Sequence, residues 1–341
     1  MAQSPLSFLL SYWLIGKCGS LEELAQHLRI LVTGGAGFIG SHLVDSLVKA
    51  HADVIVFDNL SSGNKENLSL SMKERRCHFI QGDLKSVPTI EKAVKDVDLV
   101  YHFAANPEVR EVDPKTHFNE NQVATFNLLE SMRKVATKNI VFASTSTVYG
   151  EALIQPTPEN YGPVLPISTY GASKLACEAM ITSYAYTYGI RGLILRLGNV
   201  VGSRSNHGVI HDFVKKLKKN PLELEVLGDG TQSKSYIHVS DCLSAIKIIT
   251  RGFLNSKQRA EIYNVSSADM VSVRRIAQIV LEETGLPSEI RTTGGVNGGR
   301  GWMGDVKSMQ LSIEKLRDLG WTPHYNSEEA IRQAVKELIG Q

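Results

Sequence analysis

The sequence predicts an α/β protein built on a doubly wound parallel sheet, with a smaller, discontinuous α/β lobe. Six short runs rich in Val, Ile, Leu and Phe recur in the first 200 residues, and segments long enough for helices separate them. Strands that are apolar throughout are typical of a parallel sheet that helices cover on both faces. A glycine-rich turn follows the first run, where such sheets hold phosphates.

Each of the six runs is expected to form one strand of that sheet. They are "RILVTG", "DVIVFD", "CHFIQGD", "DLVYHFAA", "NIVFAS" and "RGLILRLGN". After Gly202 the alternation weakens, and "NPLELEVLGDGTQSKS" and "RTTGGVNGGRGWMGD" are predicted to be loops around short strands. The segments "YIHVSDCLSAIKII" and "AEIYNVSS" are apolar enough to return to the sheet.

The resulting division has a dinucleotide-binding domain at 28–198 and 236–266, and a substrate lobe at 199–235 and 267–341. Residues 1–27 are predicted to be a dispensable extension, because the first strand begins cleanly at "LRILVTGG". The apolar stretch "LSFLLSYWLIG" is too short to span a bilayer, and no basic residue precedes it. A membrane protein or a secretory signal is therefore not expected.

The charge balance is nearly even, with 37 Lys and Arg against 35 Asp and Glu. This argues against a nucleic-acid partner and favours a soluble metabolic protein. The densest basic run, "KKLKK" at 215–219, is expected to be the exposed face of an amphipathic helix.

The cysteine and histidine patterns do not predict a metal or a disulfide. Four cysteines form no CxxC pair, which suits a reducing cytoplasm. His207 and His211 are four residues apart, but no third ligand stands nearby.

A phosphate-binding turn is predicted at "TGGAGFIG" (33–40), between the first strand and a helix. Glycines there allow a tight turn and bring backbone N–H groups close to a pyrophosphate, and the helix N-terminus adds a positive dipole end. The residues expected to contact the cofactor in this turn are Gly34, Gly37, Phe38, Ile39 and Gly40.

An acid at the end of the second strand predicts which dinucleotide binds. Asp58, in "VFDNL", can accept hydrogen bonds from the adenosine ribose, with Asn59 beside it. A carboxylate repels a 2′-phosphate and no Arg follows at once, so NAD is favoured over NADP. Asp83 and Leu84, after the third strand, are expected near the adenine.

The motif "YGASK" places Tyr170 and Lys174 four residues apart, on one face of a helix. Lowering a phenol pKa from near 10 to about 7 requires roughly 4 kcal/mol. An ammonium about 4 Å away, at an effective dielectric near 20, supplies about that much. Lys174 is therefore predicted to make Tyr170 a usable proton acceptor.

Taken in order, these motifs resemble the extended short-chain dehydrogenase/reductases that act on nucleotide sugars, and most of all the UDP-glucose (UDP-galactose) 4-epimerases of archaeal and bacterial type. The resemblance runs from about Leu28 to the C-terminal helix. It rests on "TGGAGFIG", "DNLSSG", "HFAAN", "NQVAT", "STSTVYG", "YGASK", "RLGNVVG", "GDGTQSKSYIHVSD", "RGWMGD" and "LGWTP".

The resemblance implies a Rossmann-type fold, bound NAD and roles for particular residues. Thr145 matches the Ser or Thr that assists the catalytic tyrosine, and Ser146 follows it at the substrate. Ala104 and Asn106 match positions that line the cofactor. Asn121 matches the Asn of "NVxGT", which supports the active-site helices at the cofactor.

On the substrate side, the resemblance implies contacts with a nucleotide sugar. Asn199 matches a residue that binds it, and Arg300 matches an arginine that clamps the diphosphate. Lys234 stands where most members have Arg, so the charge is kept but the bidentate fork is lost. Met309 stands where side-chain bulk helps to select the hexose, although a position in the core is an equal alternative.

The stretch "STSTVYG" (144–150) contains no carboxylate. Related 4,6-dehydratases carry an acidic pair at the positions of Ser146 and Thr147, and related decarboxylases keep a Glu there. The resemblance therefore implies epimerisation through a transient 4-keto sugar and enzyme-bound NADH.

The alternatives are a 4-epimerase of UDP-GlcNAc or UDP-glucuronate, or a non-catalytic NAD-binding protein. Family members usually form homodimers through two helices, and segments 114–135 and 170–188 have suitable apolar residues.

Overall fold

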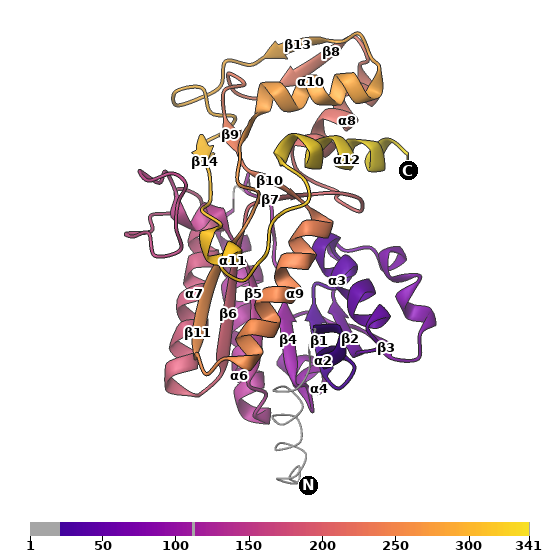
Figure 1. Ribbon diagram of the computed structural model, residues 1–341, viewed down its shortest axis with the longest axis vertical. Coiled ribbons are helices and arrows are strands. Elements are labelled where there is room, and N and C mark those ends of the chain that lie inside the picture. Colours follow the sequence, from indigo (N-terminus) through magenta and orange to yellow (C-terminus); the bar gives the residue numbers. More distant parts are fainter. Residues whose placement is uncertain (1–20, 111–112, 341) are drawn as a thin grey trace.

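The computed structural model of the chain describes residues 21–110 and 113–340. A central parallel sheet with helices on both faces forms the lower part in Figure 1, and a smaller α/β lobe lies above it. Most of the predicted N-terminal extension lies outside the described residues.

Within the described chain, seven parallel strands form the main sheet, in the order β11-β6-β5-β4-β1-β2-β3. All six predicted runs are strands of this sheet, and "AEIYNVSS" supplies the seventh beside β6. This confirms the predicted fold class. The strands are β1 (Arg29–Thr33), β2 (Asp53–Asp58), β3 (Cys77–Gln81), β4 (Leu99–His102), β5 (Asn139–Thr145), β6 (Arg191–Leu197) and β11 (Ala260–Val265).

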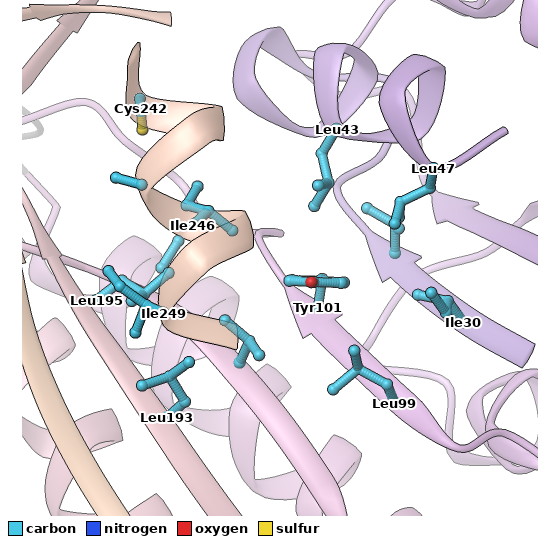
Figure 2. Packing of buried hydrophobic residues seen from close by; sticks show 14 of the residues in the cluster. Ile30, Leu43, Leu47, Leu99, Tyr101, Leu193, Leu195, Cys242, Ile246 and Ile249 are labelled. Atoms are coloured by element: carbon cyan, nitrogen blue, oxygen red, sulfur yellow. The ribbon is translucent and has the colours of Figure 1, made fainter. Parts of the chain in front are cut away.

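Five long helices cover the sheet: α3 (Phe38–Lys49), α4 (Val87–Val94), α6 (Ala124–Val135), α7 (Thr169–Thr187) and α9 (Val239–Asn255). Two of them, α3 and α9, pack on one face, where Leu43, Leu47, Ile246 and Ile249 approach Tyr101 and its neighbours (Figure 2). Helices α4, α6 and α7 cover the opposite face. Because successive strand residues point to opposite faces, apolar runs without alternation supply both cores.

The order of the strands reverses between β1 and β4. The chain moves outward from β1 to β2 and β3, then returns to place β4 on the other side of β1. In such sheets a crevice opens outside the carboxyl ends of the strands at the point of reversal, and ligands bind there.

A short helix, α2 (Leu21–Ala25), precedes β1 and packs against α9. Leu24 is 1% exposed and Ala25 is fully buried in the core that α3 and α9 share. Leu24 and Ala25 lie within the segment that was predicted to be dispensable, and their burial in the core argues that α2 contributes to stability.

A chain that begins at Leu28 should be less stable than one that begins at Leu21, by about 2–4 kcal/mol. The reason is the loss of one fully buried Leu and its neighbours from the core. Urea unfolding of the two chains measures this difference, and equal midpoints would show that α2 contributes nothing.

The lobe has its own core, to which three short sheets and three helices contribute. Its "KKLKK" helix is amphipathic as predicted: Ile210, Phe213, Val214 and Leu217 are buried, and most of the lysines face outward. The lobe elements are α8 (Val209–Lys219), β8 (Glu223–Val226), α10 (Val273–Thr284), β13 (Glu289–Thr292) and α12 (Ser327–Ile339).

Small strand pairs join the lobe to the main sheet. β7 (Asn199–Val201) pairs with β10 (Tyr236–His238), and β9 (Ser233–Lys234) lies between β12 (Val271–Ser272) and β14 (Ser308–Met309). The segment "YIHV" was expected to return to the main sheet, but its strand pairs with β7 instead, and the residues after it form α9. The remaining helical turns are η1 (Lys65–Leu68), η2 (Ser71–Lys73), α5 (Pro114–His117), η3 (Phe118–Val123), η4 (Ser146–Tyr149) and α11 (Glu314–Arg317).

Part of the segment assigned to the lobe returns to the main domain. Ile313, Leu316 and Trp321 belong to the core beside α9, and the Trp321 indole N–H donates to Ser244 Oγ at 2.7 Å. The predicted second segment, 267–341, is thus shared between the two parts of the molecule.

In the described ranges, no helix combines the length and apolar character needed to cross a bilayer. Cys77, Cys177 and Cys242 are buried free thiols, while Cys18 lies outside the described residues. No cluster of three metal-ligating side chains occurs among residues 21–110 and 113–340, and His207 and His211 form no such site there.

Candidate functional site

A cavity of about 830 Å³ lies between the main sheet and the lobe. One side of the cavity is lined by residues at, or directly after, the carboxyl ends of β1, β2, β4, β5 and β6. The other side is lined by residues of α8, β9 and the loop before β14. It therefore occupies the crevice that the reversal of strand order creates.

The glycine-rich turn forms one wall of this cavity through Gly34, Gly37, Phe38, Ile39 and Gly40. Gly34 has φ +68°, and a Cβ there would lie 2.6 Å from the backbone nitrogen of Ala104. A Cβ on Gly40 would overlap the carbonyl oxygen of Gly34. The sequence places glycine here because the turn and the helix approach too closely for a side chain.

Helix α3 begins at this wall with free N–H groups. Its N-cap, Gly37, makes no capping hydrogen bond through a side chain, and no acidic residue occupies the first turn. A helix N-terminus of this kind favours an anionic group such as a phosphate.

Asp58, at the end of β2, is a buried residue with 7% of its surface exposed. Its oxygens accept from the backbone N–H groups of Ala36, at 2.9 Å, and Leu60, at 2.8 Å. These bonds hold the carboxylate at the cavity wall. Each oxygen keeps a lone pair for a further donor, such as a ribose hydroxyl.

Asn59, Asp83 and Leu84 also line the cavity. The Asn59 amide donates to Asp83 Oδ2 at 3.2 Å. Burial raises the pKa of the Asp83 carboxyl, but hydrogen bonds from Lys85 N–H and Asn59 outweigh this effect, so its pKa lies below the usual range. Asp83 is thus an anionic acceptor at neutral pH.

Tyr170 and Lys174 lie on α7 at the opposite wall, against the end of β5. The Tyr170 hydroxyl is hydrogen-bonded to Thr145, and the Lys174 ammonium donates to the carbonyl of Ala143 at 2.8 Å. The structure therefore brings the three predicted catalytic residues together.

The electrostatics of this group differ from the prediction. Burial raises the pKa of Tyr170 to about 12, against the opposing effect of the Thr145 hydrogen bond. Burial also lowers the pKa of Lys174 to about 8. Burial therefore opposes the lowering of the Tyr170 pKa that Lys174 was predicted to produce.

Asn121 does not line the cavity, in contrast to its assignment as a cofactor contact. It is 2% exposed, and its amide accepts from Asn106 N–H at 2.8 Å and donates to Ser173 Oγ at 2.9 Å. Asn121 therefore supports the cavity wall from behind, while Ala104 and Asn106 are on the wall itself.

On the substrate side, Ser146, Asn199 and Lys234 reach the cavity. The Lys234 ammonium is 2.7 Å from Asp305 Oδ1, and its side chain is 18% exposed. The Asn199 amide donates to the carbonyl of Ser235 at 3.0 Å. The pairing of β7 with β10 places Asn199 opposite Tyr236, which also lines the cavity.

Two predicted substrate residues do not reach the cavity. Met309 is 3% exposed and packs with Val148 and Tyr149, because β14 turns its side chain into a small core. Arg300 is held beside the cavity by Glu151, whose Oε1 accepts from Arg300 Nη2 at 2.7 Å. These two assignments are not supported by the structure.

Trp302 was not singled out from the sequence, yet it lines the cavity. Lys234 lies 5.7 Å and Arg110 5.8 Å from the centre of the indole ring. Among the described residues, the buried indole Nε1 has no hydrogen-bond partner. Its place inside "RGWMGD" was the available signal, because an aromatic residue within a glycine-rich loop is well suited to contact a ligand.

These observations fit a dinucleotide together with a second ligand. The turn brings the N-terminus of α3 to one end of the cavity, and Asp58 lies there as an acceptor. Lys234 and the buried indole N–H of Trp302 are donors at the lobe end. Tyr170 and Thr145 stand between the two ends.

Comparison with known proteins gives a consistent result. A model of the NAD dependent epimerase/dehydratase family matches residues 30–266. The chain is 38% identical over 314 residues to a putative UDP-glucose 4-epimerase of Methanocaldococcus jannaschii, covering 90% of this chain and 97% of that protein.

Solved structures agree in fold. A crystal structure of a UDP-galactose 4-epimerase has a TM-score of 0.83 and 46% identity, covering 92% of this chain and 99% of that one. The Thermus thermophilus UDP-glucose 4-epimerase in complex with NAD has a TM-score of 0.79 and 32% identity, with the same coverage of both chains.

Proposed function

Because this chain belongs to the NAD dependent epimerase/dehydratase family, we propose that it is a 4-epimerase that interconverts UDP-glucose and UDP-galactose. The observation that supports this most is the wall beside Tyr170. Residues 144–147 are all hydroxyl residues and all line the cavity. Hydroxyls can orient a sugar hydroxyl, but they are too weakly basic to take a proton from carbon. The chemistry then stops at a 4-keto sugar, which must be reduced again.

The proposed proton acceptor is Tyr170. Its phenolate takes the proton of the sugar 4-hydroxyl, and Thr145 orients the phenol through their hydrogen bond. The Lys174 ammonium supplies positive charge one helical turn away. On the return step, Tyr170 donates the same proton to the 4-keto oxygen.

The cofactor residues proposed for NAD are those of the first wall. The N-terminus of α3 would hold the pyrophosphate, Asp58 the adenosine ribose, and Asp83 with Leu84 the adenine. Bound NAD would supply the acceptor for hydride from C4 of the sugar and the donor for its return, and its positively charged ring would favour the phenolate. The buried Asp58 carboxylate would exclude a 2′-phosphate, which favours NAD over NADP.

The nucleotide sugar is proposed to bind at the lobe end. Asn199 and Lys234 would hold the diphosphate while the sugar turns between its two faces, and the Trp302 indole N–H adds a donor. Lys234 acts here as a compact point charge rather than a planar fork. Its pairing with Asp305 keeps the ammonium in place at the cavity.

A product assay tests the proposal. Purified protein incubated with UDP-galactose, without added NAD, is expected to form UDP-glucose, which ion-pair chromatography separates. Faster conversion of UDP-GlcNAc or UDP-glucuronate would assign the other substrate. If protein that contains NAD converts none of these UDP-sugars, the result would favour the alternative of a non-catalytic dinucleotide-binding protein.

We also propose that the protein is a homodimer through α6 and α7. Among the residues near this surface, Phe118 is 54%, Phe126 47%, Tyr186 64% and Tyr188 55% exposed. A cluster of large exposed apolar side chains on adjacent segments is typical of an interface.

Replacing Phe126 with Glu should therefore convert the dimer to a monomer, because a carboxylate would be buried at the interface without a partner. Light scattering after size-exclusion chromatography measures the mass. Leu222, which is 73% exposed in the lobe, provides the control: Leu222→Glu should remain dimeric, and a monomeric wild type would contradict the proposal.

A further inference from the structure

Hydrogen bonds from successive turns of helix α7 connect it to the end of β5. The Tyr170 hydroxyl is hydrogen-bonded to Thr145, and one turn later the Lys174 ammonium donates to the carbonyl of Ala143. One further turn along the same face, Glu178 Oε1 accepts from the hydroxyl of a third β5 residue, Ser144, at 2.5 Å. Residues 143–145 are therefore all connected to α7, and the third connection involves a carboxylate outside the proposed catalytic group.

Glu178 is held by a bidentate ion pair with Arg196. Nη2 of Arg196 donates to Glu178 Oε2 at 2.7 Å, and its Nε lies 3.1 and 3.2 Å from the two carboxylate oxygens. The side chains are 5% and 4% exposed, so both charges are buried. Arg196 is the direct neighbour of Ser144 across the pair of strands β5 and β6.

Other contacts immobilise Arg196 from its far side. Its Nη1 donates to the carbonyl of Glu159 at 3.2 Å, and its guanidinium lies 4.6 Å from the ring centre of Tyr149. The Tyr149 hydroxyl in turn donates to Asn264 at 2.8 Å. Burial lowers the pKa of Arg196, but the hydrogen bonds with Glu178 outweigh this effect, so the pKa of Arg196 is raised.

A buried ion pair is weak as a source of stability, because desolvation opposes the attraction. Neither Glu178 nor Arg196 lines the cavity. We propose that Glu178 is a positioning residue for proton transfer at Tyr170, and that Arg196 holds it in that role. The inference rests on the proposed function. Glu178 would have two effects: it sets the register of α7 on β5, and it places a carboxylate one helical turn from Lys174.

The charge effect can be traced through the groups around Lys174. On α7 these are Tyr170, Cys177 and Glu178, and His102 faces it from β4. Burial lowers the pKa of Lys174 to about 8, and Cys177 and Glu178 oppose that shift. Burial raises the pKa of Cys177 and lowers that of His102 to about 3, so both are neutral at pH 7.

Arg196 on β6 and His117 on α5 complete the surroundings. The Arg196 charge lies beyond Glu178, and the His117 ring lies 5.7 Å from the ring of Tyr170. Of the two groups that oppose the low pKa of Lys174, Glu178 is the carboxylate, and it is the one in a buried ion pair with Arg196. Without it, the ammonium would be lost at lower pH, and the phenol would lose its nearest protein cation.

The test measures the pKa of Lys174 directly, in the protein as purified. Lysine is labelled with ¹³C at Cε, its signals are followed by NMR against pH, and the Lys174 signal is assigned by its loss in Lys174→Arg. Glu178→Gln should lower this pKa by about one unit or more, since the anion is removed and Arg196 remains. The alkaline limb of the kcat profile should move to lower pH by the same amount, with KM within about twofold of wild type.

Glu178→Gln leaves the Arg196 charge buried without its carboxylate partner, so this variant could misfold. A second variant therefore separates loss of the charge from loss of the fold. The double variant Glu178→Gln, Arg196→Met removes both charges and keeps the shape. It should fold and still lower the Lys174 pKa, by about half a unit, because Glu178 is the nearer charge. Ile181→Val, on the same helix and buried in its core, is the control, and it should leave the pKa and the kcat profile unchanged.

Two results would overturn the inference. One is a folded double variant with the wild-type Lys174 pKa and kcat profile, which would make the pair purely structural. The other is an equal shift in Ile181→Val, which would trace the effect to general loosening of α7. Because the NMR titration needs no turnover, absence of epimerase activity in the wild type would refute the proposed function without deciding this inference.

Discussion

Replacing Tyr170 with Phe is expected to lower kcat about a thousandfold while the protein retains its dinucleotide. The phenol is the proposed acceptor for the proton of the 4-hydroxyl, and positioned acid–base groups contribute about 10² to 10⁴-fold to rates. The ring itself is kept, so packing against the His117 ring, 5.7 Å away, is retained. Steady-state rates with UDP-galactose measure the loss, and absorbance of the nucleotide released on denaturation measures NAD.

The matched control is Tyr263→Phe. Tyr263 is also buried, at 7% exposure, but it lies on β11 away from the cavity. This variant should retain kcat within about twofold. If Tyr170→Phe kept wild-type turnover, another residue would have to accept the proton, and the assignment of Tyr170 would be wrong.

Gly40→Ala is expected to weaken NAD binding at least tenfold. The new Cβ overlaps the carbonyl oxygen of Gly34, so the turn must move away from α3. Overpacking of this kind costs about 1–3 kcal/mol, and every 1.4 kcal/mol is a tenfold change in affinity. The N–H groups that would hold the pyrophosphate move with the turn. Titration calorimetry of NAD into nucleotide-free protein measures the change.

Gly252→Ala separates this effect from a general effect of alanine in a helix. Gly252 lies in α9, and a Cβ there would meet nothing within 4 Å. It should therefore bind NAD as the wild type does. Unchanged affinity in Gly40→Ala would show that the turn relaxes without moving its N–H groups, and that the close approach to Gly34 does not matter for the cofactor.

The strand, turn and helix that form the proposed dinucleotide side of the cavity could be predicted from the sequence, because their determinants are local. The strand, the glycine turn and the helix start follow one another between Arg29 and Gly40, and Asp58 ends the next strand. Tyr170 and Lys174 lie on one face because a helix repeats every 3.6 residues. None of these predictions required knowledge of which distant segments meet.

The substrate side was predicted less well, because its residues come from separate short strands and loops. Met309 stands in the expected stretch, but the pairing of β14 with β9 turns it into a core. Arg300 is bound to Glu151, which is 149 positions away in the sequence. Trp302 reaches the cavity from the same loop and was missed.

Local sequence is enough to predict the succession of strands, the position of the turn and the face shared by Tyr170 and Lys174, because periodicity and glycine placement act over a few residues. The burial of α2 in the core and the pairing of Glu178 with Arg196 behind the site depend on how distant segments fold together. The burial of the Tyr170 phenol depends on the fold in the same way. Burial and charge depend on which distant groups surround a side chain, and chain folding, not local spacing, brings those groups together.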